Sequence, residues 1–365
     1  MHFMDALHSR LYSWLERDSD FQSGWQKLEN GQVNITTDQG SERTENQDRV
    51  VVLKASSPGN VEHLLVIVCD GMGGMLDGGL CASLAVSGVV VAFLRSRFAS
   101  LPERLSRSAQ DANLAVFKNY AGKGGATLSA VCVSSSGEAC GLNVGDSRIY
   151  GSRSGKIAAL SIDDTIAGQI GPEKGGAESN SLLQFIGIGP DMEPHVVEVP
   201  ADLNWVFITT DGAHFIPSEA LALLVARSRT ATEMGRRVVQ AAQWMGSRDN
   251  GTVACVQMPL RISSSTVERS VRLVDPWGEL HVLNPTEGRP IHATNADHAE
   301  DKEQQRHHLQ DGETENTQVA SATRDKRSNK RRVTKGKPPS SENLEKPTQS
   351  IEIFEINDTS TDGNK

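Results

Sequence analysis

The 365-residue sequence predicts an α+β fold in which two packed antiparallel sheets are flanked by helices, followed by a disordered C-terminal tail. Runs rich in Val, Ile and Leu follow one another across short turns, which favours antiparallel pairing. The helical segments come in pairs and do not alternate strictly with strands, which argues against a doubly wound parallel sheet. Nearly all core-forming residues lie before about residue 258, so the compact part of the chain ends near there.

The chain opens with an amphipathic segment. Apolar side chains recur at helical spacing at Met4, Leu7, Leu11 and Leu15, and they predict a helix over residues 3–17. Such a helix either packs against the domain that follows or docks a partner, and the sequence leaves both readings open.

The middle of the chain alternates β-type runs with turns, and helices follow in pairs. Two long helices are expected over Gly79–Phe98 and Leu101–Tyr120, and two shorter ones over Pro217–Ser228 and Thr232–Met245. A proline at the start of the third helix suits a first-turn position. The expected strands are Val33–Thr37, Arg49–Leu53, Leu64–Cys69, Ala126–Val133, Ala139–Val144, Arg148–Gly151, His195–Val199, Trp205–Thr209 and Thr252–Met258.

A short piece follows the last of these strands. The apolar runs Val271–Val274 and Leu280–Leu283 flank an Asp-Pro-Trp-Gly turn, which predicts a hairpin. This hairpin either caps the domain or stands alone. The sequence thus divides into an N-terminal extension (1–28), a large domain (29–260), a hairpin extension (261–283) and a tail (284–365).

The tail lacks the residues needed to form a core. Between Asn284 and Ser350 there are ten apolar residues and no aromatic one, so this stretch is expected to be disordered. The basic run Arg324–Lys337 is either a solvated segment or a contact for an acidic partner or nucleic acid. The apolar island Ile351–Ile356 is either incidental or a docking strand or helix.

Charge and cysteine usage exclude several classes of protein. The net charge of −9 argues against a whole-chain nucleic-acid binder, which needs a basic surface. The five cysteines form no CxxC pair, which fits a reducing compartment. No apolar run is expected to reach the length of a membrane span, and the N-terminus has no secretory pattern. We therefore expect a soluble cytoplasmic protein without membrane contacts.

Four acidic residues stand at the ends of predicted strands. Asp70 and Asp211 each follow a predicted strand and precede a glycine. Asp48 and Asp249 each lie just before a predicted strand. A strand end holds a carboxylate rigidly, and a glycine bares a carbonyl as a further ligand. Carboxylates gathered at one sheet edge repel unless divalent cations lie between them, and an all-oxygen site selects Mg²⁺ or Mn²⁺. Any one Asp-Gly alone is more often a simple turn; the set indicates a metal site.

Other common catalytic patterns are missing. The sequence has no P-loop, no dinucleotide-binding glycine pattern in a βαβ unit, no GxSxG elbow and no HExxH helix.

Six short motifs follow one another between about residues 30 and 260. They are Arg43-x-x-Asn46-Gln47-Asp48, Val68-Cys69-Asp70-Gly71-Met72-Gly73-Gly74, Gly125-Ala126-Thr127-Leu128, Val144-Gly145-Asp146-Ser147-Arg148-Ile149-Tyr150, Thr210-Asp211-Gly212 and Asp249-Asn250-Gly251-Thr252. As an ordered set, they resemble the metal-dependent serine/threonine protein phosphatases, the protein phosphatase 2C family, in their bacterial form. The resemblance implies a four-layer αββα sandwich whose catalytic domain spans residues 29–260.

The resemblance also implies a two-metal site at one end of the sandwich, filled by Mn²⁺ or Mg²⁺. By motif, Asp70 would bridge both metals and the Gly71 carbonyl would bind the second. Asp211 and Asp249 would complete the first, and Asp48 would bind or hold metal-bound water.

Further roles follow from the same resemblance. Asp146 matches a position that helps to hold a third, weaker metal together with Asp211. Arg43 matches the arginine that grips the substrate phosphate. Asn250 and Thr127 are expected to support the site structurally.

The sequence departs from the family pattern in places that concern access and proton transfer. Gln47 stands where many members carry glutamate, and Met72 stands where eukaryotic members carry a histidine proposed as general acid. The stretch Ser161–Thr165 replaces the usual Asp-His-Ser, and the flap region Ile166–Pro190 is short and Gly-rich. These departures leave the choice of substrate open.

Three histidines lie within or beside predicted core elements: His63, His195 and His214. We interpret them as structural. His214 stands two residues after the Asp211-Gly212 pair, so it is the one to test.

The function implied by the resemblance is hydrolysis of phosphoserine and phosphothreonine on proteins by a metal-activated water, without a phosphoenzyme. Its partners would be phosphoprotein substrates and a cognate serine/threonine kinase. Two alternatives remain. One is a non-catalytic phosphoprotein-binding or scaffold module on the same fold. The other is a phosphatase of a partner-switching regulatory system, which differs only in substrate.

Overall fold

A computed structural model describes residues 3–17, 22–170, 181–263 and 270–283. The expected tail, with its basic run and its apolar island, lies outside the described residues.

Two antiparallel sheets form the centre of the fold. The first has the strand order β1-β2-β11-β10-β7-β8, and the second has the order β13-β12-β3-β4-β5-β6-β9. The strands of the first sheet are β1 (Ser23–Leu28), β2 (Val33–Asp38), β7 (Arg148–Arg153), β8 (Lys156–Ala159), β10 (Trp205–Thr209) and β11 (Gly251–Gln257). Those of the second are β3 (Arg49–Ser57), β4 (Val61–Cys69), β5 (Leu128–Ser134), β6 (Ala139–Val144), β9 (His195–Glu198), β12 (Ser270–Asp275) and β13 (Gly278–Leu283).

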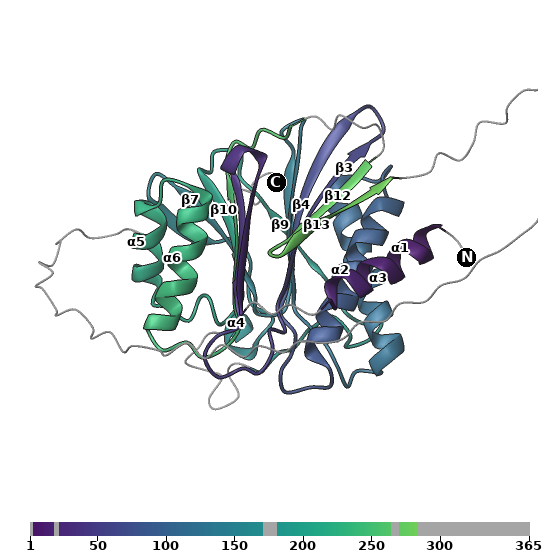
Figure 1. The fold of residues 1–365 in the computed structure, drawn as a ribbon, viewed down its shortest axis with the longest axis horizontal. Helices are drawn as coiled ribbons and strands as arrows, with labels where there is room; N and C mark the ends of the chain where they lie inside the picture. Colours follow the sequence, from purple (N-terminus) through teal and green to yellow (C-terminus); the bar gives the residue numbers. More distant parts are fainter. Residues whose placement is uncertain (1–2, 18–21, 171–180, 264–269, 284–365) are drawn as a thin grey trace, which may run out of the picture. The chain divides into compact units, whose positions relative to one another are not determined.

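Helices cover the outer face of each sheet. In Figure 1, α5 (Ser218–Arg227) and α6 (Ala231–Trp244) lie against the first sheet, and α2 (Gly78–Arg95) and α3 (Leu101–Tyr120) lie against the second. The short α4 (Ile166–Ile170) follows β8. The expected four-layer αββα arrangement is therefore confirmed.

The sequence of β4 shows how one strand supplies two cores. Leu65 and Ile67 pack toward the helices α2 and α3, whereas Leu64, Val66 and Val68 pack between the sheets. Alternate side chains of a strand point to opposite faces, so a strand covered on both faces reads as a continuous apolar run. This explains why β4 is apolar from Leu64 to Cys69 without polar alternation.

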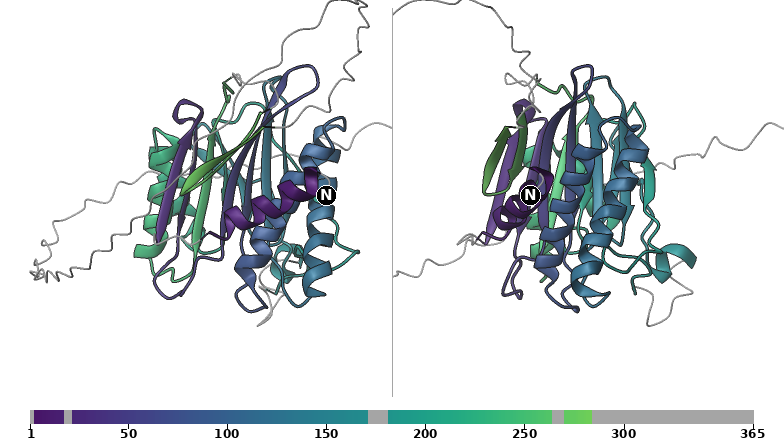
Figure 2. Two further views of the ribbon diagram at one scale, coloured as in Figure 1. Left: turned by 45° about the vertical axis from the view of Figure 1, so that its right-hand side comes forward. Right: turned by 90° about the vertical axis from the view of Figure 1, so that its right-hand side faces the viewer.

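Helix α2 corrects one expectation about membranes. By length and composition alone, Gly78–Arg95 is apolar enough to cross a membrane, contrary to the prediction that no run approaches that length. However, 78% of this window is buried inside the fold. Figure 2 shows α2 and α3 side by side on the second sheet, so the apolar composition of α2 belongs to a core helix.

Both ends of the compact domain reach further than the predicted boundaries. Two strands were not predicted from the sequence: β1, which precedes residue 29 and pairs with β2, and the four-residue β8. The predicted hairpin forms as β12 and β13, and β12 pairs with β3. The hairpin therefore extends the second sheet and does not stand alone.

The N-terminal helix α1 (Phe3–Leu15) packs on the domain. Leu7, Leu11 and Leu15 are buried in the same core as α2 and α3. Just after the helix, Arg17 forms an ion pair with Asp275 of β12 at 2.6 Å. Figure 2 shows α1 beside the β12–β13 hairpin, so the first of the two readings of this helix holds.

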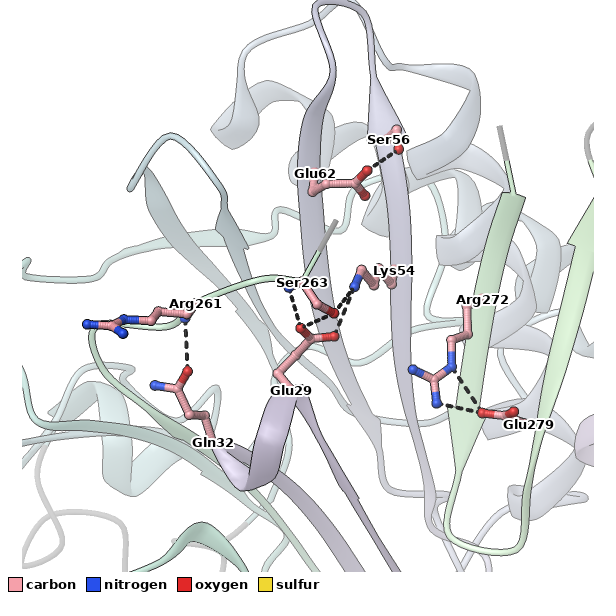
Figure 3. A network of polar contacts seen from close by, with 9 residues as sticks. All are labelled: Glu29, Gln32, Lys54, Ser56, Glu62, Arg261, Ser263, Arg272 and Glu279. Carbon is pink, nitrogen blue, oxygen red and sulfur yellow. Dashed lines mark hydrogen bonds and ion pairs between the residues drawn. The ribbon is translucent and has the colours of Figure 1, made fainter. Parts of the chain in front are cut away.

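A buried ion pair ties the two sheets together. Glu29, in the turn between β1 and β2, accepts a hydrogen bond from Lys54 of β3 at 3.1 Å. The two side chains are 1% and 10% exposed. The second carboxylate oxygen of Glu29 accepts the N–H of Ser263 at 2.6 Å and its hydroxyl at 2.8 Å (Figure 3). Glu29 has a φ of 46°, a strained conformation for a residue with a side chain, and these contacts hold it there.

Removing the carboxylate from this network should destabilise the fold. Glu29→Ala leaves the buried Lys54 ammonium with the Ser263 hydroxyl at 2.7 Å but without its charged partner. Breaking a buried ion pair in this way costs about 3–5 kcal/mol. We expect the free energy of unfolding to fall by about that amount, measured by urea unfolding followed by circular dichroism.

The control is Asp202→Asn, which breaks the Arg153–Asp202 pair, whose side chains are 43% and 60% exposed. It should change the free energy of unfolding by less than about 1 kcal/mol. A Glu29→Ala protein as stable as this control would contradict the stabilising role of the pair.

Candidate metal centre

The predicted aspartates gather at one end of the sandwich. Antiparallel register brings the start of β3 beside the end of β4 and the end of β10 beside the start of β11. The same end also holds the β6–β7 turn, because β6 ends opposite the start of β5. The acidic residues at these points are Asp48 before β3, Asp70 after β4, Asp146 between β6 and β7, Asp211 after β10 and Asp249 before β11.

These carboxylates face one another closely enough to change one another's ionisation. Burial, together with the charges of Asp211 and Asp249, raises the pKa of Asp48 to about 7. Burial also raises the pKa of Asp70 well above its usual value, with the other four aspartates adding to the effect. The pKa of Asp146 rises to about 6, mainly through burial and then through Asp211. Each group therefore resists becoming an anion beside the others.

The Asp211 carboxyl group belongs to the same cluster. Its pKa is raised first by burial and then by the charge of Asp249, and it lies within hydrogen-bonding reach of Asp70. The cluster therefore joins the ends of both sheets, since Asp70 follows a strand of the second sheet and Asp211 a strand of the first.

Asp48 carries an oxygen without a partner. Its Oδ2 accepts a hydrogen bond from the Thr210 hydroxyl at 3.0 Å, whereas Oδ1 is buried and has no hydrogen-bond partner among the described residues. Buried polar atoms are almost always satisfied, so an orphan oxygen in a crowd of carboxylates fits a cation. The all-oxygen donor set is that of Mg²⁺ or Mn²⁺.

The carboxylates do not by themselves form a closed set of ligands. Over the described residues, no group of three or more His, Cys, Asp or Glu side chains is placed to hold a metal ion. Mg²⁺ usually keeps several waters and takes only one or two carboxylates directly, so a closed protein cage is not required for it. The residues present therefore fit a hydrated divalent cation.

Two glycines at the site are required by close packing of the backbone. A Cβ on Gly71 would lie 2.4 Å from the backbone carbonyl group of Gly78. A Cβ on Gly212 would lie 2.0 Å from the backbone carbonyl oxygen of Asn250. Both distances are too short for any side chain, so glycine is required next to Asp70 and next to Asp211 for packing alone.

Neutral side chains brace the loops that carry the aspartates. The Thr127 hydroxyl binds the Asp70 N–H at 3.0 Å and the Ser147 hydroxyl at 2.7 Å. The Asn250 side chain accepts the Gln47 N–H at 2.8 Å and donates to the carbonyl of Glu45 at 3.0 Å. Thr127 and Asn250 thus support the site, as expected from the sequence.

Arg43 reaches into the cluster. Its guanidinium group donates from Nε and Nη2 to the two oxygens of Asp249, both at 2.6 Å. The side chain is 41% exposed, and a Cβ on Gly73 of the Gly-rich loop would lie 2.6 Å from its Nη1. Arg43 therefore places positive charge at the mouth of an otherwise acidic site.

The histidines divide into two groups. Burial lowers the pKa of His63 to about 4 and that of His214 to about 3, so both are neutral near pH 7. His63 packs edge-on against Phe93, and His214 contacts the Thr209 hydroxyl at 2.9 Å, which fits structural roles. His195 is different, because it contacts the buried Asp164 at 2.9 Å. This pair was not predicted, and its only signal in the sequence was the departure at residues 161–165 from the family pattern.

The chain is similar to several bacterial proteins, although no family model matches it. It is 26% identical over 242 residues to a putative protein phosphatase 2C-type of Streptococcus pyogenes, covering 61% of this chain and 96% of the relative. It is 26% identical over 253 residues to the protein phosphatase PhpP of Streptococcus pneumoniae, covering 62% and 97%. The solved structure of the PPM Ser-Thr phosphatase MsPP from Mycobacterium smegmatis in complex with cacodylate matches with 29% identity and a TM-score of 0.51, covering 62% and 97%.

These relatives are covered almost completely, and more than a third of this chain extends beyond them. The ordered motifs, the two-sheet architecture and the similarity agree. The chain is therefore similar, in sequence and in fold, to bacterial phosphatases of the protein phosphatase 2C type.

Proposed function

We propose that this protein is a divalent-cation-dependent serine/threonine protein phosphatase. The observation that carries the proposal is the gathering of five aspartates at one end of the sandwich, next to an arginine. The named activity of the similar proteins supports the same reaction class. The substrates would be phosphoproteins, and a cognate serine/threonine kinase would supply them.

Six residues of the chain would hold the cations. When bound, Mn²⁺ or Mg²⁺ neutralises charge on phosphoryl oxygens and lowers the pKa of a bound water. The proposed ligands are Asp48, Asp70, the carbonyl of Gly71, Asp146, Asp211 and Asp249.

Arg43 would bind the substrate phosphate. Its two bonds to Asp249 use two of the five guanidinium N–H donors, so three remain to receive phosphoryl oxygens. Hydrogen bonds between ionised groups are about twice as strong as neutral ones, and the planar guanidinium suits a phosphate. Asp249 thus orients Arg43 toward the position where the phosphoryl group would lie.

Asp48 would orient the attacking water. Its Oδ2 is fixed by Thr210, and its unpartnered Oδ1 is an acceptor that can hold a water proton. No side chain of this chain needs to form a covalent bond to phosphorus, which is consistent with the absence of a nucleophile motif.

The carboxylate at the centre of the assigned site provides the first test. Asp70→Asn removes one negative charge but keeps the shape of the side chain. We expect hydrolysis of p-nitrophenyl phosphate and of a phosphothreonine peptide with Mn²⁺ to fall on the order of 100-fold or more, because metal ions contribute several kcal/mol to catalysis.

Circular dichroism should show an unchanged fold, and the matched Asp202→Asn control should keep full activity. Wild-type protein that neither binds Mn²⁺ by calorimetry nor releases phosphate would refute the phosphatase. An Asp70→Asn protein that performs its biological role unchanged would favour the scaffold alternative.

A second test concerns the tail. All proposed site residues precede the last described strand, β13, so a chain that ends at Leu283 should hydrolyse p-nitrophenyl phosphate with kcat/KM within about twofold of the full-length value. Activity is measured with Mn²⁺, and the fold is checked by thermal unfolding. Loss of folding on truncation would show that the tail belongs to the domain.

A further inference from the structure

A second polar cluster lies beside the metal centre and is not explained by the mechanism. Asp164, in the loop between β8 and α4, has a side chain that is only 2% exposed. It is enclosed by residues from three separate segments: Gly145 after β6, Gln184, and His195 of β9. A buried carboxylate is costly unless donors surround it, so its position is set by these contacts.

Asp164 forms two hydrogen bonds with the turn that contains Asp146. The Gly145 N–H donates to Asp164 Oδ2 at 2.9 Å, and the Asp164 N–H donates to the Gly145 carbonyl at 2.9 Å. Gly145 has a φ of 101°, and a Cβ there would lie 2.8 Å from Thr127, so glycine is required at this position. Asp146 directly follows Gly145, so the two hydrogen bonds between Gly145 and Asp164 also fix the backbone position of Asp146.

The other side of Asp164 holds the segment that returns to β9. Its Oδ1 accepts from His195 Nε2 at 2.9 Å and from Gln184 Nε2 at 3.4 Å. Because a carboxylate only accepts, His195 must present Nε2–H to it. The Leu183 N–H donates to the Asp164 carbonyl at 2.7 Å, and Gln184 Oε1 accepts the Glu193 N–H at 2.8 Å. Asp164 therefore links this segment to the turn before Asp146.

The neighbouring charges do not satisfy Asp164 in place of His195. Asp163 is engaged by Arg148, which donates to both of its oxygens at 2.7 to 3.0 Å. Among the described residues, His195 is the one ionisable side chain paired with the Asp164 carboxylate. Loss of His195 would leave Oδ1 with the longer bond from Gln184.

We propose that Asp164 and His195 form a positioning pair that fixes Asp146 and the Leu182–Gln184 segment against the end of the second sheet. Cation affinity at Asp146 then depends on two residues that touch neither cation nor substrate. This inference rests on the proposed function in one respect, since it takes Asp146 as a cation ligand. Residues that orient ligands typically change metal affinity about 10- to 100-fold when they are replaced.

The test measures Mn²⁺ binding to the full-length protein by isothermal titration calorimetry, with Mn²⁺ alone as the probe. His195→Leu removes the donor, and Asp164→Asn turns one acceptor into a donor; each should weaken one class of Mn²⁺ site about 10- to 100-fold. The double variant should bind Mn²⁺ no more weakly than the single variants, because the two residues act as a unit.

His195→Gln keeps an N–H donor and should restore the Mn²⁺ affinity to within about threefold of the wild-type value. Glu198→Gln, on the exposed face of the same strand, should bind as wild type does.

A second readout does not depend on metal. In metal-free protein, amide exchange of Gly145 and Leu183 should accelerate at least about tenfold in His195→Leu and remain unchanged in Glu198→Gln. Wild-type protein that binds no Mn²⁺ would refute the proposed function, and the exchange data would then still decide on the pair. Unchanged exchange, or Mn²⁺ affinity equal to wild type in both single variants, would overturn the inference. If His195→Leu fails to fold, Asp164→Asn and the rescue by His195→Gln decide the same question.

Discussion

Mutual repulsion among carboxylates at one end of the sandwich is the constraint on which the rest of this structure depends. Two unit charges 4 Å apart interact by about 4 kcal/mol at an effective dielectric of 20. Antiparallel pairing alone brings Asp48 beside Asp70 and Asp211 beside Asp249, since each pair flanks adjacent strand ends. The fold must therefore hold together a set of groups that repel one another. Burial is the main cause of the raised pKa values of Asp48, Asp70 and Asp146, and the charges of the neighbouring aspartates raise them further.

The chain resists this repulsion mainly with packing and neutral donors. The strands that lead to Asp70 and Asp211 are buried where they approach these aspartates, and Val66 and Val68 of β4 share one apolar cluster with Ile208 of β10. Glycines let the backbone segments of the site approach more closely than side chains would allow. Arg43 compensates Asp249 directly, while Arg148 pairs with Asp163 outside the cluster. An excess of negative charge is thus left at the site, which suits a site built to bind cations.

Elements with strong periodicity could be predicted from the sequence, and those shaped by context could not. The helix Leu101–Tyr120 was predicted at its observed bounds, because its apolar stripe and flanking turns are local signals. Strand β1 (Ser23–Leu28) holds Gly24 and Lys27 and has no apolar run, so it forms only because β2 offers it an edge. Helix α2 shows the opposite case. Its apolar composition permits either a membrane span or a core, and only the packing of α3 against it decides. The positions of the aspartates followed from strand ends, whereas their roles as ligands rest on the family resemblance.

Long-range polar pairs mark the limit of sequence reasoning here. Lys54 interrupts an apolar strand, and such a charge signals that some partner must be buried with it, but nothing local shows that the partner is Glu29. Asp164 gave a similar signal when it broke the family pattern, yet its partner His195 lies 31 residues away in a strand that reads as ordinary core. Each pair joins segments that a strand register alone would leave free to shift, one between the two sheets and one at the metal centre. A charged residue that departs from the expected pattern, whether the apolar run of a strand or a family motif, is therefore the sequence feature that best indicates such a junction. Only the three-dimensional structure identifies the other residue of the pair.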